Sequence, residues 1–174
     1  MRRSLAVLLA AVLTAALLAV PATAGQTDLV SPPKIFKSKL PGVKTKSGID
    51  VFLPSHLRVF TSARRVKGDV STDDGFYDLE LGIGSRCNGA NACFIGNFTG
   101  TRGAEPAFGR RARLTGGRTG YWKGITCGAS CSPAEIQWVE DDVLYTIATK
   151  AVGVKKEKAT LVKLANSAIK AGPR

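Results

Sequence analysis

The chain has 174 residues, and its 25 Lys and Arg residues outnumber its 13 Asp and Glu residues, which gives a net charge of +12. So basic a chain favours anionic partners through long-range attraction. Aromatic residues make up 7% of the sequence and are not interleaved with the basic clusters, so we do not expect nucleic acid, bound through stacked bases, as a partner.

The first 24 residues have the three parts of a secretory signal peptide in the required order. Two arginines supply the positive start, the apolar run spans residues 5–20, and Ala22 and Ala24 are small residues at a cleavage site. The run of 16 residues is shorter than the roughly 20 that a membrane-spanning helix needs. We therefore expect cleavage after Ala24 and export, with no membrane span in the mature protein.

Two other export signals match less well. The arginine pair resembles a twin-arginine signal but is common in any signal peptide, and a lipoprotein needs a cysteine at the cleavage point, whereas the first cysteine is Cys87. Cleavage removes two of the 25 basic residues and none of the 13 acidic ones, which leaves 23 against 13 and a net charge of +10. We expect a single domain, released into the periplasm, the cell wall or the medium.

Residues 25–48 contain no apolar period long enough to predict a packed element. Pro32, Pro33 and Pro41 interrupt this segment, and five lysines charge it. We expect a flexible basic entry segment, followed by one disulfide-containing domain over residues 49–171.

From residue 49 the pattern is that of short β-strands. It is clearest over residues 76–83, where Asp78 and Glu80 fall on one face and the apolar residues on the other, as in a half-buried strand. The other predicted strands are residues 49–53, 57–66, 93–98, 111–114, 120–126, 136–139 and 143–148. The last two are joined by residues 140–142, an acidic connection of hairpin length.

Residues 158–170 change to the helical period, with Leu161, Leu164 and Ala168 on one stripe, and Gly172 with Pro173 ends the helix. Strands in series followed by one helix predict an α+β domain. We expect an antiparallel sheet of about six to eight short strands covered by the C-terminal helix.

Four cysteines in an exported chain predict disulfides, and they form two close pairs, Cys87 with Cys93 and Cys127 with Cys131. Loop entropy by itself favours crossing bridges, at about 4 kcal/mol each against roughly 2 kcal/mol for the local ones. Flexible spacers let each local pair close with little strain, so we favour 87–93 and 127–131, with the crossing pairings left open. The spacings differ from those of a zinc knuckle and no His lies nearby, so we expect no metal and no cofactor.

No catalytic group stands out. His56 is the only histidine, and no Gly-x-Ser-x-Gly motif accompanies it. The acidic residues 73–74 and 140–142 lie where turns are expected, without the spacing of a calcium loop. The glycines at 82–84 and 115–117 are not followed by the helix that a phosphate-binding loop needs. We expect no enzyme; a hydrolase of envelope polymer or glycan, using His56 or a carboxylate pair, is the alternative.

Six arginines around the cysteine pairs form the candidate anion-binding surface: Arg86, Arg102, Arg110, Arg111, Arg113 and Arg118. The planar guanidinium suits phosphate and carboxylate groups, and small disulfide loops hold a surface rigid. We expect a non-enzymatic binding domain for an anionic envelope component or another extracytoplasmic protein. If the bridges only protect the chain and the arginines are scattered, a structural or inhibitory secreted module is the second alternative.

Several segments resemble a group of exported bacterial proteins of unknown function. They include residues 51–55, 77–81, 87–98, 127–138, 143–147 and 164–169, among them the Cys-Gly-Ala-Ser-Cys loop, the Ile-Gln-Trp strand and the Leu-Tyr-Thr-Ile strand. The resemblance covers residues 49–170. It implies an extracytoplasmic domain of sheet pairs, a disulfide loop and a packing helix, and it brings no catalytic residues.

Overall fold

The computed structural model describes residues 27–84, 91–153 and 156–174. The predicted signal peptide at residues 1–24, Arg86 and Cys87 lie outside the described residues.

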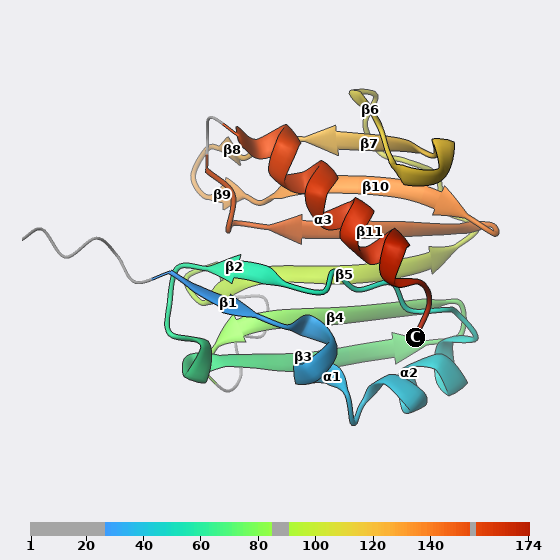
Figure 1. Ribbon diagram of the computed structural model, residues 1–174, viewed down its shortest axis with the longest axis horizontal. Coiled ribbons are helices and arrows are strands. Elements are labelled where there is room, and N and C mark those ends of the chain that lie inside the picture. The colour runs from blue at the N-terminus through green and yellow to red at the C-terminus, as the bar shows by residue number, and fades with distance from the viewer. Residues whose placement is uncertain (1–26, 85–90, 154–155) are drawn as a thin grey trace, which may run out of the picture.

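A seven-stranded antiparallel sheet, in the order β3-β4-β5-β11-β10-β7-β6, forms the scaffold (Figure 1). Its strands are β3 (Val66–Asp73), β4 (Phe76–Ile83), β5 (Phe94–Arg102), β6 (Arg111–Arg113), β7 (Thr119–Lys123), β10 (Ala134–Glu140) and β11 (Val143–Thr149). Two-residue turns join β3 to β4 and β10 to β11. With the C-terminal helix α3 (Glu157–Ala171), this sheet confirms the predicted α+β fold.

Helix α3 and the N-terminal elements that cover the core lie on one face of the sheet (Figure 1). Helix α3 crosses β7, β10 and β11, whereas the small sheet of β1 (Asp28–Val30) and β2 (Leu57–Val59) lies over the other half together with α1 (Pro32–Phe36). Helix α2 (Leu40–Ser47) follows beside β3. The opposite face of the sheet carries no helix in the described part of the chain.

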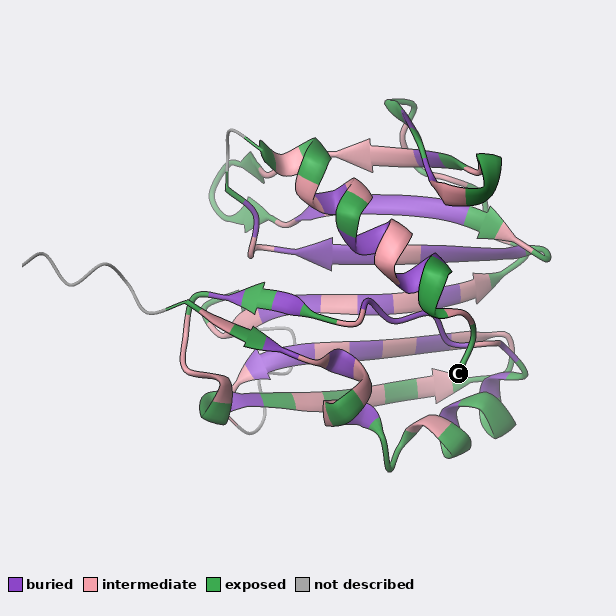
Figure 2. Cartoon of the chain, in the orientation of Figure 1, coloured by how far each residue is buried: buried purple, intermediate pink, exposed green. Residues whose placement is uncertain are grey.

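The core fills the space between the sheet and these covering elements; buried positions alternate with less buried ones along β4, whereas β11 is buried at nearly every position (Figure 2). Trp138 is fully buried at its centre, where Tyr145 stacks on it at 5.5 Å between ring centroids and Phe52 meets it edge-on at 6.2 Å. Phe52 belongs to residues 49–53, a predicted strand that is buried but pairs with no other strand in the described residues. The apolar residues of this segment therefore indicate that it is buried, and not that it forms a paired strand.

The predicted flexible entry segment is wrong for residues 28–48, which form β1, α1 and α2. Prolines stand in the first positions of both helices, where a missing N–H costs nothing, and Gly48 ends α2 in the left-handed conformation (φ 62°). Phe36 is fully buried against β3, where a Cβ on Gly68 would lie 2.5 Å from its ring. These helices have five and eight residues, too short for a helical period to emerge in the sequence.

Three further segments differ from expectation. Of the predicted strand 57–66, Leu57–Val59 forms β2 and Val66 begins β3; a short 3-10 turn, Ala63–Arg65, lies between them. Strand β3 was not predicted, because its covered face carries small residues such as Gly68 in place of large apolar ones. The two-residue strands β8 (Thr126–Cys127) and β9 (Cys131–Ser132) form a small hairpin between β7 and β10.

No helix in the described ranges is long and apolar enough to cross a membrane.

Candidate functional site

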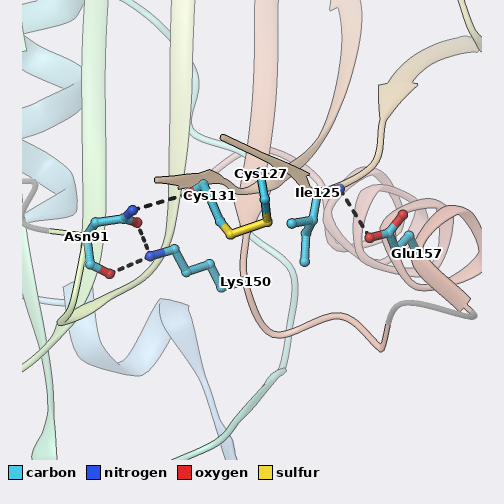
Figure 3. Close-up of a disulfide and its surroundings, with 6 residues drawn as sticks. All are labelled: Asn91, Ile125, Cys127, Cys131, Lys150 and Glu157. Atoms are coloured by element: carbon cyan, nitrogen blue, oxygen red, sulfur yellow. Dashed lines mark hydrogen bonds between the residues drawn. A yellow bond between two sulfur atoms is a disulfide. The ribbon is translucent and has the colours of Figure 1, made fainter. Parts of the chain in front are cut away.

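Cys127 and Cys131 form a disulfide that closes the β8–β9 hairpin (Figure 3). This confirms the local pairing predicted for these two residues. Cys93 is also disulfide-bonded, and its predicted partner Cys87 lies outside the described residues. A disulfide is the state expected of an extracytoplasmic protein.

The two cysteine-containing segments meet at one end of the sheet (Figure 3). The Asn91 side chain donates a hydrogen bond of 3.3 Å from Nδ2 to the carbonyl oxygen of Cys131. The Lys150 ammonium group donates to both the side-chain and the main-chain oxygen of Asn91. Asn91 and Lys150 therefore link the segment before Cys93 to the β8–β9 hairpin.

Two of the predicted arginines are engaged by other groups of the protein. Arg102 ends β5 and donates a hydrogen bond of 2.8 Å to the carbonyl oxygen of Gly48. Arg118 makes a two-point ion pair with Glu140, at 2.5 and 2.9 Å, and this hydrogen bonding raises the pKa of its guanidinium. Arg86 lies outside the described residues. Two of the six predicted arginines are thus engaged by other groups of the protein, and the anion-binding role of the six stays a prediction.

The other three arginines lie together at the β6 rim of the sheet. Antiparallel pairing of β6 with β7 places the Arg110 guanidinium 4.3 Å from the ring centroid of Trp122, and that of Arg111 5.9 Å from the ring of Tyr121. Lys158, at the start of α3, holds its ammonium group 5.9 Å from the same Trp122 ring. We name the exposed cations of this rim the basic edge: Arg110, Arg111, Arg113, Lys156 and Lys158.

A hollow of about 560 Å³ opens between β6, β7 and the first turns of α3. Its floor includes the apolar surfaces of Trp122 and Val162, and its rim carries Arg113, Lys156 and Lys158. Glu157 is the acidic residue at this hollow, and its Oε1 accepts a hydrogen bond of 3.1 Å from the backbone N–H of Ile125 (Figure 3).

Within the described residues, no member of the basic edge forms a salt bridge. The nearby Lys123 does so, with Glu135 at 2.8 Å. Stacking over an aromatic ring holds a guanidinium plane in place while its N–H donors still point outward. The basic edge is thus a set of partly oriented cations that form no salt bridge in the described residues, with Glu157 as the acidic residue at the same hollow.

The pairing of β6 with β7 and the packing of α3 bring the residues of the basic edge together, so their proximity could not be seen in the sequence. Trp122 is far in sequence from both Arg110 and Lys158, so the separation of aromatic from basic residues holds in the sequence but not in space. Lys156, Lys158 and Trp122 were not among the predicted site residues. For the two lysines, the only indication in the sequence was the cluster of lysines at the start of the predicted helix.

The groups considered for catalysis stay apart. His56 is exposed just before β2 and contacts neither acidic turn in the described residues. Asp141 and Asp142 form the two-residue β10–β11 turn, with φ values of 49° and 61°, as a type I′ hairpin requires. Nowhere in the described ranges do three His, Cys, Asp or Glu side chains converge in a group that could hold a metal ion.

Comparison of the chain with family models, with curated proteins and with solved structures finds no match. The resemblance to exported bacterial proteins stays a prediction, and the functional argument rests on the geometry of the surface.

Proposed function

We propose that this chain is an exported, non-enzymatic domain that binds an anionic polymer of the cell envelope through the basic edge. The observation that carries this proposal is the stacking of Arg110, Arg111 and Lys158 on Trp122 and Tyr121 without acidic partners. The signal-peptide pattern and the Cys127–Cys131 disulfide support export.

The spread of the cations favours a polymer over a single small anion. Arg111 and Arg113 alternate with the buried Ala112, so they share one side of the rim, while Lys156 and Lys158 approach from the helix side. Arg113, Lys156 and Lys158 line the hollow, whereas Arg110 and Arg111 are not part of its lining, so the five cations extend beyond a single point. A chain with phosphate or carboxylate groups at intervals can engage several of them at once, each contact contributing about 0.2–1 kcal/mol.

Preorganisation favours the same surface. A long, mobile side chain loses roughly 0.5–1.5 kcal/mol of conformational freedom when it binds, and stacking on a ring removes part of that freedom beforehand. The rings of Trp122 and Tyr121 are fixed by the β6–β7 pairing and by α3. The exposed lysines of α1 and α2 have no such support in the described structure.

The test compares two triple variants that lower the net charge equally. Arg110→Gln/Arg111→Gln/Arg113→Gln removes the arginines of the basic edge, and Lys34→Gln/Lys37→Gln/Lys46→Gln removes three exposed charges of α1 and α2. Retention of the purified protein is measured on immobilised polyphosphate, on immobilised polygalacturonate and on isolated cell envelopes.

We expect the arginine variant to bind at least about tenfold more weakly and the lysine variant to change little. Retention should also fall steeply with salt, because the screening length shrinks from about 10 Å at 0.1 M to about 3 Å at 1 M. Equal losses in both variants would show that only net charge matters. Absence of retention on all three supports would refute the proposal.

A further inference from the structure

The face of the sheet opposite α3 carries two rows of polar side chains, set by the strand register. In one row, Glu80, Asn97, Ala148 and Glu135 stand side by side on β4, β5, β11 and β10. In the next row, Asp78, Thr99, Thr146 and Gln137 follow the same order. The alternation of strand residues thus places apolar groups against the core and amide, hydroxyl and carboxylate groups together on this face.

Differences in side-chain length make these rows concave. Ala148, Thr99 and Thr146 are short and lie in the middle strands, whereas the longer Asn97, Glu135 and Gln137 stand around them. The result is a groove of about 430 Å³, within the size range of about 300–1,000 Å³ that is usual for small-molecule sites. We call it the polar groove.

Two amide groups of the polar groove are oriented by their neighbours. Gln137 is only 7% exposed, and its Oε1 accepts a hydrogen bond of 2.9 Å from the backbone N–H of Ala107. Its Nε2 donor therefore turns the other way, and it has no partner in the described residues. Asn97 donates from Nδ2 to Asp78 at 3.1 Å, which leaves its Oδ1 as an acceptor.

The hydroxyl groups of Thr99 and Thr146 also make no hydrogen bond within the described chain. The polar groove therefore offers, side by side, an oriented donor, an oriented acceptor and two hydroxyl groups that can do either. The ring of Phe94 lines the groove beside them, with the Lys150 ammonium group 5.7 Å from its centroid. Sugars match this combination, because each hydroxyl both donates and accepts while the C–H face of the ring packs on an aromatic surface.

The charged residues at the polar groove favour a different ligand from the anionic polymer proposed for the basic edge. The carboxylate of Glu135 lines the polar groove, already paired with Lys123, and Lys150 is hydrogen-bonded to Asn91 at its border. The groove thus presents carboxylates without an uncommitted cation in the described residues, which disfavours polyanions. A neutral ligand carries no such penalty.

We propose that the polar groove binds a short stretch of a neutral oligosaccharide. The polar groove shares no residue with the basic edge, although Tyr121, on which Arg111 stacks, stands beside Gln137 in the register. The inference does not depend on the anionic polymer. A protein with both sites would hold a charged and an uncharged part of an envelope material at once, at neighbouring places on one sheet.

The test uses maltotriose, cellotriose and triacetylchitotriose as neutral probes, each titrated to about 10 mM and followed by the amide signals of ¹⁵N-labelled protein. The groove variant Thr99→Val/Thr146→Val removes both hydroxyl groups while keeping side-chain size and strand preference. Its matched control, Ser71→Val/Thr101→Val, removes two hydroxyl groups from the same face outside the groove. A second variant, Ala148→Met, places a larger side chain in the floor of the polar groove.

We expect at least one probe to give saturable shifts at the side-chain amides of Asn97 and Gln137. The groove variant should weaken that binding about tenfold, because two hydrogen bonds are lost, and the control should not. Ala148→Met should block binding, and the triple arginine variant should leave it unchanged. Absence of saturable shifts with all three probes, or equal weakening in the control, would overturn the proposal.

Discussion

Asp78 shows how one side chain of the open sheet face responds to its surroundings. Its carboxyl group is partly buried on β4 beside Thr99 of the neighbouring strand β5. This burial raises its pKa above the ordinary value of 3.8. The hydrogen bond from Asn97 acts in the opposite direction, and the charge of Glu80 adds to the rise. The folded state therefore holds the charged form of Asp78 at a cost.

Replacing Asp78 by Asn should stabilise the protein at neutral pH. The cost of the charged carboxylate is absent well below 3.8, where Asp78 is protonated in both states; it develops between 3.8 and the raised pKa of the folded state and is complete above that pKa. The gain of Asp78→Asn should therefore appear in urea unfolding at pH 7 and vanish at about pH 3. Asp69→Asn, an exposed change on β3, is the control; a gain independent of pH would contradict the argument.

The sequence alone could not predict which partner each arginine contacts in the folded protein. Arg110 and Arg118 look alike in the sequence, yet one stacks on Trp122 and the other is bound by Glu140, 22 residues away. Which partner each finds depends on the register of β6, β7 and β10, and a one-residue shift would exchange the two faces. The sequence identified arginine as the functional residue type, but it could not select the members of the site.

At the scale of elements, length decides what a pattern can predict. Strand β4 was predicted with its observed limits, Phe76–Ile83, because eight alternating residues specify both a strand and its buried face. The C-terminal helix was placed within one residue at each end, since its 15 residues contain several turns of apolar period. Helix α1 has five residues, and only its prolines indicated where it begins.

The packing of α1 can be tested with two phenylalanines. Phe36→Ala should lower the free energy of unfolding by about 3–5 kcal/mol, because it leaves a cavity against Gly68 on β3. Phe60→Ala, at a side chain that is 49% exposed, should cost much less. Urea denaturation of both variants gives the comparison. Similar small losses would restore the view of residues 28–48 as a loosely attached arm.

At the scale of the whole molecule, one core joins both halves of the sheet. Phe52 contacts Trp138 and Tyr145 from a segment that the chain enters after α2, and the Arg174 backbone N–H donates to the carbonyl oxygen of Val51 at 3.2 Å. The C-terminal end of the chain is thus anchored to this core segment. This arrangement followed from the predicted sheet-and-helix fold, but the role of residues 49–53 as its centre did not.

A shared core predicts a single unfolding transition. In a Trp122→Phe variant, fluorescence reports only on Trp138 at the centre, while far-ultraviolet circular dichroism reports on the whole sheet. The two signals should give the same midpoint in urea, as two-state unfolding requires. Separate midpoints would show that the α3 half and the α1 half of the sheet unfold independently.

The arginines of β6 also affect how copies of this protein behave at high concentration. Strand β6 is a free edge of the sheet, and β3 at the other edge carries Lys67, Asp69 and Asp73. Charged, short edge strands resist pairing between molecules, which otherwise leads to aggregation. We therefore expect the repulsion among guanidinium groups at the β6 rim to oppose pairing between copies. A bound polyanion would cancel that repulsion and bring neighbouring copies within reach of one another.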